Sequence, residues 1–210
     1  MSATPVQHDD AAMNAPAAAP VGSAVPPMPQ RVPIKHCRNC GTAVVYRLPD
    51  DGDTRVRGVC PACDTIHYEN PANVVGTIPM LGERVLLCKR NIEPRWGKWT
   101  LPAGFMELGE SLAQGAARET DEEAGAQFEI GSLFSVISVV RVGQVHMFYA
   151  ARLLSDQFNP GHETIEARLF TEDEIPWDEI AFRTVRETLR LYFDDRRANT
   201  VGKVHVFDIS

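Results

Sequence analysis

The stretch that decides the fold runs from Gly104 to Ala126 and reads GFMELGESLAQGAARETDEEAGA. Glu119, Glu122 and Glu123 are spaced so that a helix places all three on one face, with Cβ atoms roughly 5–6 Å apart. Three like charges on one face are unfavourable unless a cation neutralises them. Mg²⁺ (or Mn²⁺) prefers carboxylate oxygens and water, and it commonly completes its octahedron with phosphate oxygens. The spacing therefore predicts a metal centre that can bind a diphosphate.

The same stretch contains signals that begin and end a helix. Ser111 is a suitable N-cap residue, and Gly125 stands where a C-cap glycine belongs. We therefore expect a helix over residues 111–124. In the loop before it, Gly104 supplies backbone conformations that other residues resist, which allows the backbone to come close to the metal.

On both sides of this helix, apolar segments alternate with turn residues. The segments rich in β-branched and apolar residues are expected to form strands: Val74–Met80, Val85–Arg90, Phe128–Val142 and Gln144–Leu153. Apolar residues at helical spacing predict a second amphipathic helix over Ile180–Arg197. The order of these elements predicts an α/β (α+β) fold, with a mixed sheet sandwiched between helices.

Two cysteine pairs precede the expected sheet. Cys37 and Cys40 form one pair, and Cys60 and Cys63 form the other. This spacing is typical of a four-thiolate zinc ribbon. A structural Zn²⁺ held this way can supply roughly 10–16 kcal/mol of folding free energy. We favour a scaffold role for the ribbon over nucleic-acid recognition, and we expect Cys88, in an apolar strand, to be a core thiol.

Composition limits the classes of partner. The formal net charge of -7 at pH 7 argues against a nucleic-acid or lipid-surface binder, which usually has a basic stripe. Any polyanion that the protein binds is therefore expected to need a cation as intermediary. No apolar run approaches the roughly 20 residues that span a bilayer. A homodimer is left open.

The domain boundaries follow from changes in composition along the chain. Residues 1–35 are rich in alanine and proline and are expected to be a disordered tail without a secretory signal, which predicts a cytoplasmic protein. Residues 36–69 are expected to form the zinc ribbon. Residues 70–198 are expected to form the main domain, and residues 199–210 a short C-terminal end.

The acidic stretch resembles the Nudix box at the positions Gly104, Glu110, Arg118, Glu119, Glu122, Glu123 and Gly125. This resemblance implies a Nudix fold and water attack on a phosphorus whose oxygens are polarised by metal ions. It implies that Glu119 and Glu123 are the principal metal ligands and that Glu122 assists. It also implies that Arg118 holds a ligand glutamate in place.

The general base is drawn from different places in Nudix enzymes. Relatives often have an additional metal-binding or basic glutamate just before the Arg-Leu-Phe strand, where this chain has Glu163 and Glu166. We favour Glu163 as both base and additional metal ligand. His162 is the alternative, and a solvated loop carboxylate is the neutral interpretation.

A zinc ribbon joined to a Nudix domain resembles two groups, the NADH pyrophosphatases and the plant chloroplast-type ADP-ribose and FAD pyrophosphatases. The NADH group has a Ser-Gln-Pro-Trp-Pro-Phe-Pro signature after the box, which is missing from residues 138–146 here. The plant-type group matches through residues 68–76, 97–106, 167–170 and 174–182. This resemblance implies cleavage of a small-molecule nucleotide, FAD and/or ADP-ribose, with release of AMP.

Three other interpretations stay open. The chain could be an NADH pyrophosphatase, a non-catalytic nucleotide-binding regulator, or a nucleic-acid module that trims caps. Retention of all box glutamates counts against the regulator. Four aromatic residues are candidates for stacking on a flavin or adenine, although aromatics at this density more often serve packing: Trp96, Trp99, Phe105 and Trp177.

Overall fold

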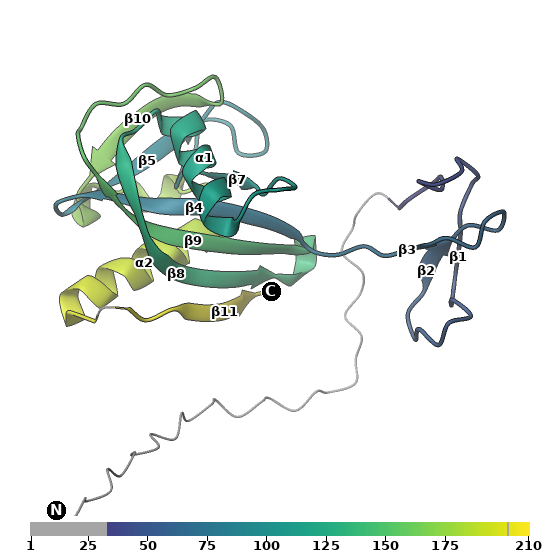
Figure 1. Ribbon diagram of the computed structural model, residues 1–210. Helices are drawn as coiled ribbons and strands as arrows, with labels where there is room; N and C mark the ends of the chain where they lie inside the picture. The colour runs from purple at the N-terminus through teal and green to yellow at the C-terminus, as the bar shows by residue number, and fades with distance from the viewer. Residues whose placement is uncertain (1–32, 201) are drawn as a thin grey trace, which may run out of the picture.

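The computed structural model describes residues 33–200 and 202–210, so the tail expected over residues 1–35 lies almost wholly outside the described residues (Figure 1). The first folded unit is a small antiparallel sheet in the order β1-β2-β3. Its strands are β1 (Val45–Arg47), β2 (Arg57–Val59) and β3 (Ile66–His67). Such short strands bury little apolar surface, so a unit of this kind needs another source of stability.

The main domain is built on a mixed sheet in the order β10-β5-β4-β9-β8-β11, to which β6 and β7 are attached. The pairs β4–β9 and β8–β11 are parallel, whereas the other pairs are antiparallel. The strands are β4 (Ala72–Leu81), β5 (Arg84–Arg90), β6 (Trp99–Thr100), β7 (Ala103–Phe105), β8 (Phe128–Val139), β9 (Gln144–Leu153), β10 (Thr164–Phe170) and β11 (His205–Ile209). The predicted mixed sheet is confirmed.

The strands β4 and β5 separate beyond their hairpin, and the segment that fills the gap between them contributes to the cavity described below. These two strands pair only next to their hairpin, at Met80 and Leu81. Farther along, β4 pairs with β7 and β5 pairs with β6, so the β6–β7 segment is inserted between them. Gly76 on β4 permits this insertion, because a Cβ there would come closer than 3.0 Å to the carbonyl oxygen of Pro102.

Two α-helices cover opposite faces of this sheet, as predicted (Figure 1). They are α1 (Leu112–Ala124) and α2 (Arg183–Ala198). Adjacent residues of β9 show the two layers, because successive side chains of a strand point to opposite faces. Met147 packs in a cluster with Ala116 of α1, whereas Phe148 packs in the larger core with Leu189 of α2.

The ends of α1 follow the sequence signals. Ser111 forms a capping box with Gln114, in which each side chain bonds the other residue's backbone N–H. Gly125 ends the helix with φ 56°, a left-handed conformation that favours glycine. Thr120 is fully buried and its hydroxyl lies 2.7 Å from that of Thr77 on β4, which fixes the rotation of the helix against the sheet. The acidic face therefore has a defined direction.

Several boundaries differ from the sequence prediction. The strand expected to reach Val142 ends at Val139, because the chain turns through η1 (Val140–Val142) before Gly143, which has φ 63°. Helix α2 starts later than expected, because Ile180 bridges to Trp99 instead. Strand β11 was missed. Two further 3₁₀ turns are η2 (Glu172–Glu174) and η3 (Trp177–Glu179).

None of the helices in the described part of the chain combines the length and the apolarity needed to cross a membrane.

Candidate active site

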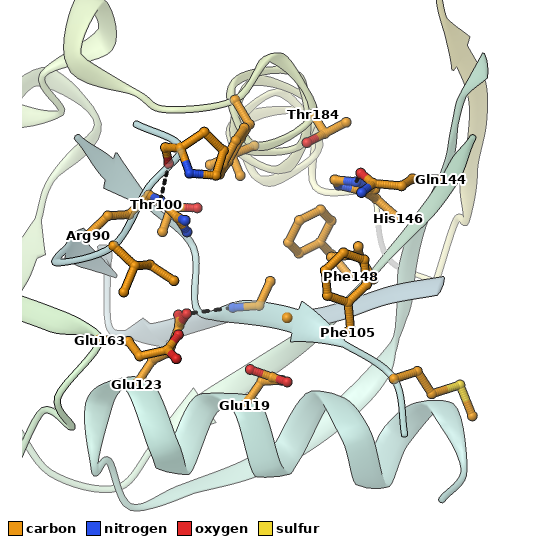
Figure 2. A pocket seen from close by; sticks show the side chains of 18 of the residues that line it. Arg90, Thr100, Phe105, Glu119, Glu123, Gln144, His146, Phe148, Glu163 and Thr184 are labelled. Carbon is orange, nitrogen blue, oxygen red and sulfur yellow. Dashed lines mark hydrogen bonds between the residues drawn. The ribbon is translucent and has the colours of Figure 1, made fainter. Parts of the chain in front are cut away.

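A cavity of about 850 Å³ lies between α1, the loop before it, β9 and the start of α2. Its acidic side has Glu119, Glu122, Glu123 and Glu163. Figure 2 shows Gln144, His146 and Thr184 away from Glu119, Glu123 and Glu163, on the other side of the space. The cavity therefore has one strongly charged end and one largely uncharged end.

Glu119 points into the acidic side and is mostly covered, with 12% of its side chain exposed. The backbone of Gly104 lies against this carboxylate, because a Cβ added at Gly104 would come closer than 3.0 Å to both carboxylate oxygens of Glu119. Glycine is thus required for the backbone of β7 to pass so close to this carboxylate. Burial raises the pKa of Glu119, and the neighbouring Arg118 opposes this shift.

Glu123 lies one turn farther along α1 and is 6% exposed. Its Oε2 accepts a hydrogen bond from the backbone N–H of Ala103, at 3.2 Å. The pKa of Glu123 is raised to about 8, mainly by burial. The hydrogen bond from Ala103 and the charge of Arg90 lower this pKa, whereas the charges of Glu119 and Glu163 contribute to raising it. The ionised form of this carboxylate therefore requires a compensating positive charge.

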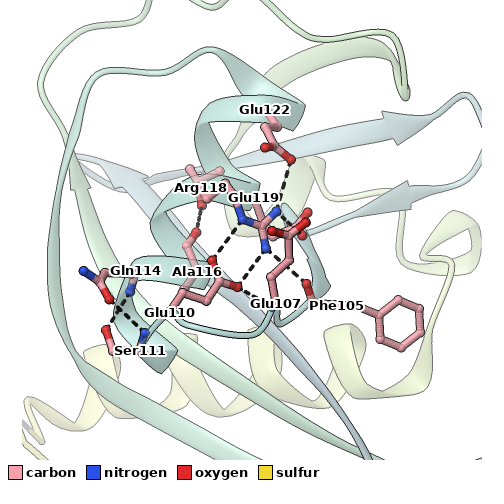
Figure 3. Close-up of polar contacts among 10 residues, drawn as sticks. Phe105, Glu107, Glu110, Ser111, Gln114, Ala116, Arg118, Glu119 and Glu122 are labelled. Carbon is pink, nitrogen blue, oxygen red and sulfur yellow. Dashed lines mark hydrogen bonds and ion pairs between the residues drawn. The ribbon is translucent and has the colours of Figure 1, made fainter. Parts of the chain in front are cut away.

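Arg118 holds the acidic side together (Figure 3). Its Nε and Nη2 donate to the two carboxylate oxygens of Glu110, at 3.0 and 2.9 Å. Its Nη1 donates to Glu119 at 2.8 Å and to Glu122 at 3.2 Å, and Nη2 also donates to the carbonyl oxygen of Phe105 at 3.1 Å. All five N–H donors of the guanidinium are used. Arg118 thus joins the loop before α1 to the acidic face of the helix.

Glu110 is a positioning residue to which the sequence analysis gave no role. Besides binding Arg118, its Oε1 accepts a 2.6 Å hydrogen bond from the backbone N–H of Glu107. A Cβ at Gly115 would come closer than 3.0 Å to the same oxygen, so that glycine makes room for it. Its position among the residues that resemble the Nudix box was the sequence feature from which a role for Glu110 could have been predicted.

Glu122 is the outermost carboxylate of the acidic face. Its side chain is 59% exposed, although it still lines the cavity and contacts Arg118. The carboxyl groups of this face are thus graded from the buried Glu123 to the solvated Glu122. An assisting role for Glu122 stays a prediction that agrees with this position.

The structure distinguishes the three candidates in the loop before β10. Glu163 lines the cavity with its side chain 45% exposed, and Figure 2 shows it beside Glu123. Asn91 fixes this loop, since its N–H donates to the Glu163 carbonyl and its amide donates to the His162 carbonyl, at 2.8 and 2.9 Å. The His162 side chain is 93% exposed at the rim. Glu166, expected before the strand, instead lies within β10 and is not among the cavity-lining residues.

The four aromatic candidates divide clearly. Trp99 is 5% exposed in the core and Trp177 packs against that core, while Trp96 is exposed but is not among the residues that line the cavity. Phe105 is 58% exposed and lines it. Phe182, which the sequence analysis did not consider for stacking, lines the cavity too. The guanidinium of Arg90 lies 5.1 Å from the centre of its ring.

The four cysteines of the N-terminal unit form a compact cluster. Their sulfur atoms lie within 4.8 Å of one another, with separations of 3.7 Å for Cys37–Cys63 and 3.4 Å for Cys40–Cys60. Four sulfurs at 2.3 Å from a tetrahedral Zn²⁺ would be roughly 3.8 Å apart. Hydrogen bonds from Thr65 lower the pKa of Cys63 to about 6, which favours its thiolate form. Burial raises the pKa of Cys60 to about 11, so this thiol would ionise only with a cation beside it. The cluster therefore fits a structural zinc ion.

Comparisons with known proteins agree with both units. Residues 70–191 match the family model described as NUDIX domain, and residues 35–69 match the zinc-ribbon model described as Nudix N-terminal. The crystal structure of a NUDIX hydrolase from Nitrosomonas europaea is 49% identical, with a TM-score of 0.79, and the match covers 84% of this chain and 100% of that one. An ADP-ribose pyrophosphatase structure from Streptococcus suis, 22% identical with a TM-score of 0.53 over 66% of this chain and 100% of that one, shares the fold.

Curated relatives are more distant. The NAD-capped RNA hydrolase NudC of Photobacterium profundum is 29% identical over 136 residues, covering 65% of this chain and 49% of that protein. The ADP-ribose pyrophosphatase of Methanocaldococcus jannaschii is 29% identical over 113 residues, covering 52% and 67%. This chain spans about half the length of the NudC relatives that it matches. Because the NUDIX model matches more than half of its 210 residues, the chain belongs to the Nudix hydrolase family, with a Nudix-type zinc ribbon before the Nudix domain.

Proposed function

We propose that this protein hydrolyses the diphosphate bond of a nucleoside diphosphate derivative with the help of Mg²⁺ or Mn²⁺. The observation that carries the proposal is the pair Glu119 and Glu123, one helical turn apart and both facing one cavity, with the side-chain-free Gly104 against the first of them. Membership of the Nudix family supports the same reaction class.

The acidic side has the chemistry that a hard divalent cation requires. Its donors are carboxylate oxygens, and burial raises the pKa of both Glu119 and Glu123, so ionising them without a cation is unfavourable. Glu119, Glu122 and Glu123 would hold the cation, with Glu163 and the backbone at Gly104 completing the site. A cation bound there would neutralise the diphosphate and polarise its phosphorus–oxygen bonds.

The chain's own residues would carry out the remaining steps. Arg118 keeps Glu119 directed into the cavity through the hydrogen bonds described above. As the water oxygen forms its bond to phosphorus and the anhydride P–O bond breaks, the carboxylate of Glu163 accepts a proton from the water. The leaving phosphate takes the electron pair of the broken bond. Arg90 lines the cavity and brings positive charge for a phosphate oxygen.

The preferred substrates are FAD and/or ADP-ribose, with release of AMP. This choice rests on the resemblance to the plant chloroplast-type pyrophosphatases, and the ADP-ribose pyrophosphatase relative supports ADP-ribose. NADH is the second candidate, because matched relatives are described as NAD(P)H pyrophosphatases and NAD-capped RNA hydrolases. An adenosine diphosphate half is common to these molecules.

The test is to incubate the full chain with Mg²⁺ and each of FAD, ADP-ribose, NADH and NAD-capped RNA, and to measure AMP or the released RNA. Glu119→Gln removes a ligand charge while keeping the shape of the side chain, so it should lower kcat at least about 100-fold. Glu129→Gln is the matched control, because Glu129 is 62% exposed and pairs with Arg152 on the surface. Equal rates for Glu119→Gln and wild type would contradict the proposed centre. Nucleotide binding without turnover by the wild type would support a regulator instead.

A further inference from the structure

The uncharged end of the cavity has features that the proposed chemistry does not use. Gln144, His146 and Phe148 alternate along β9 and therefore point to the same face of the sheet. All three line the cavity, as does Thr184 in the first turn of α2. Two segments that are distant in the sequence thus present an amide, an imidazole and a hydroxyl to one space.

These groups are neutral and held in place. The Nε2 of His146 lies 2.9 Å from the Oε1 of Gln144, so the imidazole orients the amide. Burial lowers the pKa of His146 to about 4, and the ring is therefore uncharged at neutral pH. The carbonyl oxygen of Gln144 has a second lone pair, and its amide nitrogen makes no hydrogen bond within the described residues. The amide thus keeps a donor and an acceptor for a ligand.

Thr184 is the independent observation that points to a ligand. The residue is 3% exposed, yet its hydroxyl has no hydrogen-bond partner among the described residues. A buried hydroxyl without a partner is destabilising, and such groups are therefore rare in proteins. On the same helix, the buried Thr188 does have a partner, since its hydroxyl lies 3.4 Å from that of Ser135. Of these two threonines, only Thr184 lines the cavity.

The surroundings indicate what kind of group would bind. Apolar side chains line the cavity near these groups, namely those of Val139, Val142, Phe148, Val185 and Ile209. Arg183 also lines the cavity, but it is exposed to solvent. A phosphate would have to give up its water against such an apolar surface, whereas a flat aromatic ring would bury apolar area there. A neutral amide can pair with the donor and acceptor on the edge of a base, as glutamine does with adenine.

We infer that Gln144 and Thr184 bind the edge of the adenine ring, that His146 positions Gln144, and that this end of the cavity makes the site select a nucleotide over a simple sugar phosphate. This inference rests on the proposed function for the identity of the base. The diphosphate then reaches toward Glu119 and Glu123, which face the same cavity from the acidic side.

The test measures equilibrium binding of AMP and of ribose 5-phosphate to the full chain in Mg²⁺, for the wild type and for Thr184→Val and Gln144→Leu. Loss of one or two neutral hydrogen bonds should weaken AMP binding about 5- to 10-fold and leave ribose 5-phosphate binding within about twofold. Thr188→Val is the matched control and should bind both ligands like the wild type. Thermal unfolding distinguishes the effects of the two threonine substitutions. Thr184→Val removes a hydroxyl without a partner and should not lower Tm, whereas Thr188→Val breaks the hydrogen bond to Ser135 and should lower Tm.

The inference is overturned if Thr184→Val and Gln144→Leu both bind AMP like the wild type, or if they weaken both ligands equally. It is also overturned if the wild type binds AMP no better than ribose 5-phosphate. Failure of the proposed function looks different, because the wild type would then prefer AMP in binding but release none from FAD, ADP-ribose or NADH.

Discussion

Replacing Arg118 with lysine keeps the positive charge and changes only the number and geometry of the donors. Arginine has five N–H donors in a planar fork, whereas lysine has three on one nitrogen. In the structure all five donors are used, on Glu110, Glu119, Glu122 and the carbonyl oxygen of Phe105. At least two of these hydrogen bonds must therefore be lost in Arg118→Lys.

The expected magnitude follows from these bonds and their burial. Hydrogen bonds to charged groups contribute about 1.5–3 kcal/mol each, so two lost bonds would cost at least about 3 kcal/mol if fully buried. Since 25% of the Arg118 side chain is exposed, water replaces part of this, and we expect the free energy of unfolding to fall by about 2 kcal/mol. Glu119 then loses its fixed direction, and the loss of such a positioning residue typically lowers activity or metal affinity 10- to 100-fold.

Two measurements check this prediction. Urea unfolding gives the change in stability, and kcat measured over a series of Mg²⁺ concentrations separates weaker metal binding from slower turnover. Arg152→Lys is the matched control, because Arg152 is 65% exposed in a surface ion pair, and such pairs contribute about 0–1 kcal/mol. If Arg118→Lys keeps both its kcat and its Mg²⁺ dependence within about twofold of the wild type, Arg118 does not position the carboxylates.

Three further predictions concern other parts of the molecule. In Gly104→Ala the new Cβ must displace the Glu119 carboxylate, so kcat should fall at least about 10-fold. Gly58→Ala is the control and should leave kcat unchanged, because its Cβ would lie at an ordinary contact distance of 3.5 Å from Val44. Elemental analysis should find one zinc per chain in the wild type and none in Cys60→Ser, and a zinc-free wild type would refute the ribbon. In Cys60→Ser, residues 36–69 should become sensitive to protease while residues 70–198 remain resistant. Burial lowers the pKa of His146 from 6.5 in the unfolded chain to about 4 in the folded protein. Between these pH values the unfolded chain binds the proton more readily than the folded one. The free energy of unfolding should therefore fall by up to about 3 kcal/mol as the pH is lowered from 6.5 toward 4. Urea unfolding of His146→Gln should show a smaller drop between these pH values, and an unchanged drop would contradict this.

Local physics explains why the sequence predicted the α1 region well. The capping box at Ser111, the glycine at position 125 and the spacing of the glutamates all depend on neighbours within a few residues. The strands expected over Val74–Met80 and Val85–Arg90 were also recognised from their own residues, and Gly82 adopts φ 63° in the turn between them. Each of these features can be recognised without knowledge of the rest of the chain.

Features set by distant contacts were harder to predict. Strand β11 is short and isolated at the end of the chain, and it is a strand because it pairs in parallel with β8. The start of α2 was placed too early for a related reason, since Ala181 donates its N–H to the carbonyl oxygen of Trp99 at 2.8 Å and Ile180 extends as a bridge. In both cases a tertiary partner overrides the local pattern.

The same distinction separates the chemistry of the site from its selectivity. Carboxylates that gather a cation can be placed at helical spacing within one segment, so any chain with the box can be recognised as having the acidic side. The opposite side forms only where β9 meets the first turn of α2, and that meeting depends on the strand order β4-β9-β8 and on the length of the loops between them. Gln144 and Thr184 can therefore change without affecting the box. In the proposed binding mode, this end holds the adenosine half that FAD, ADP-ribose and NADH share, so it selects adenine nucleotides as a class. The choice among these substrates would then be made by residues that contact the other half of the molecule.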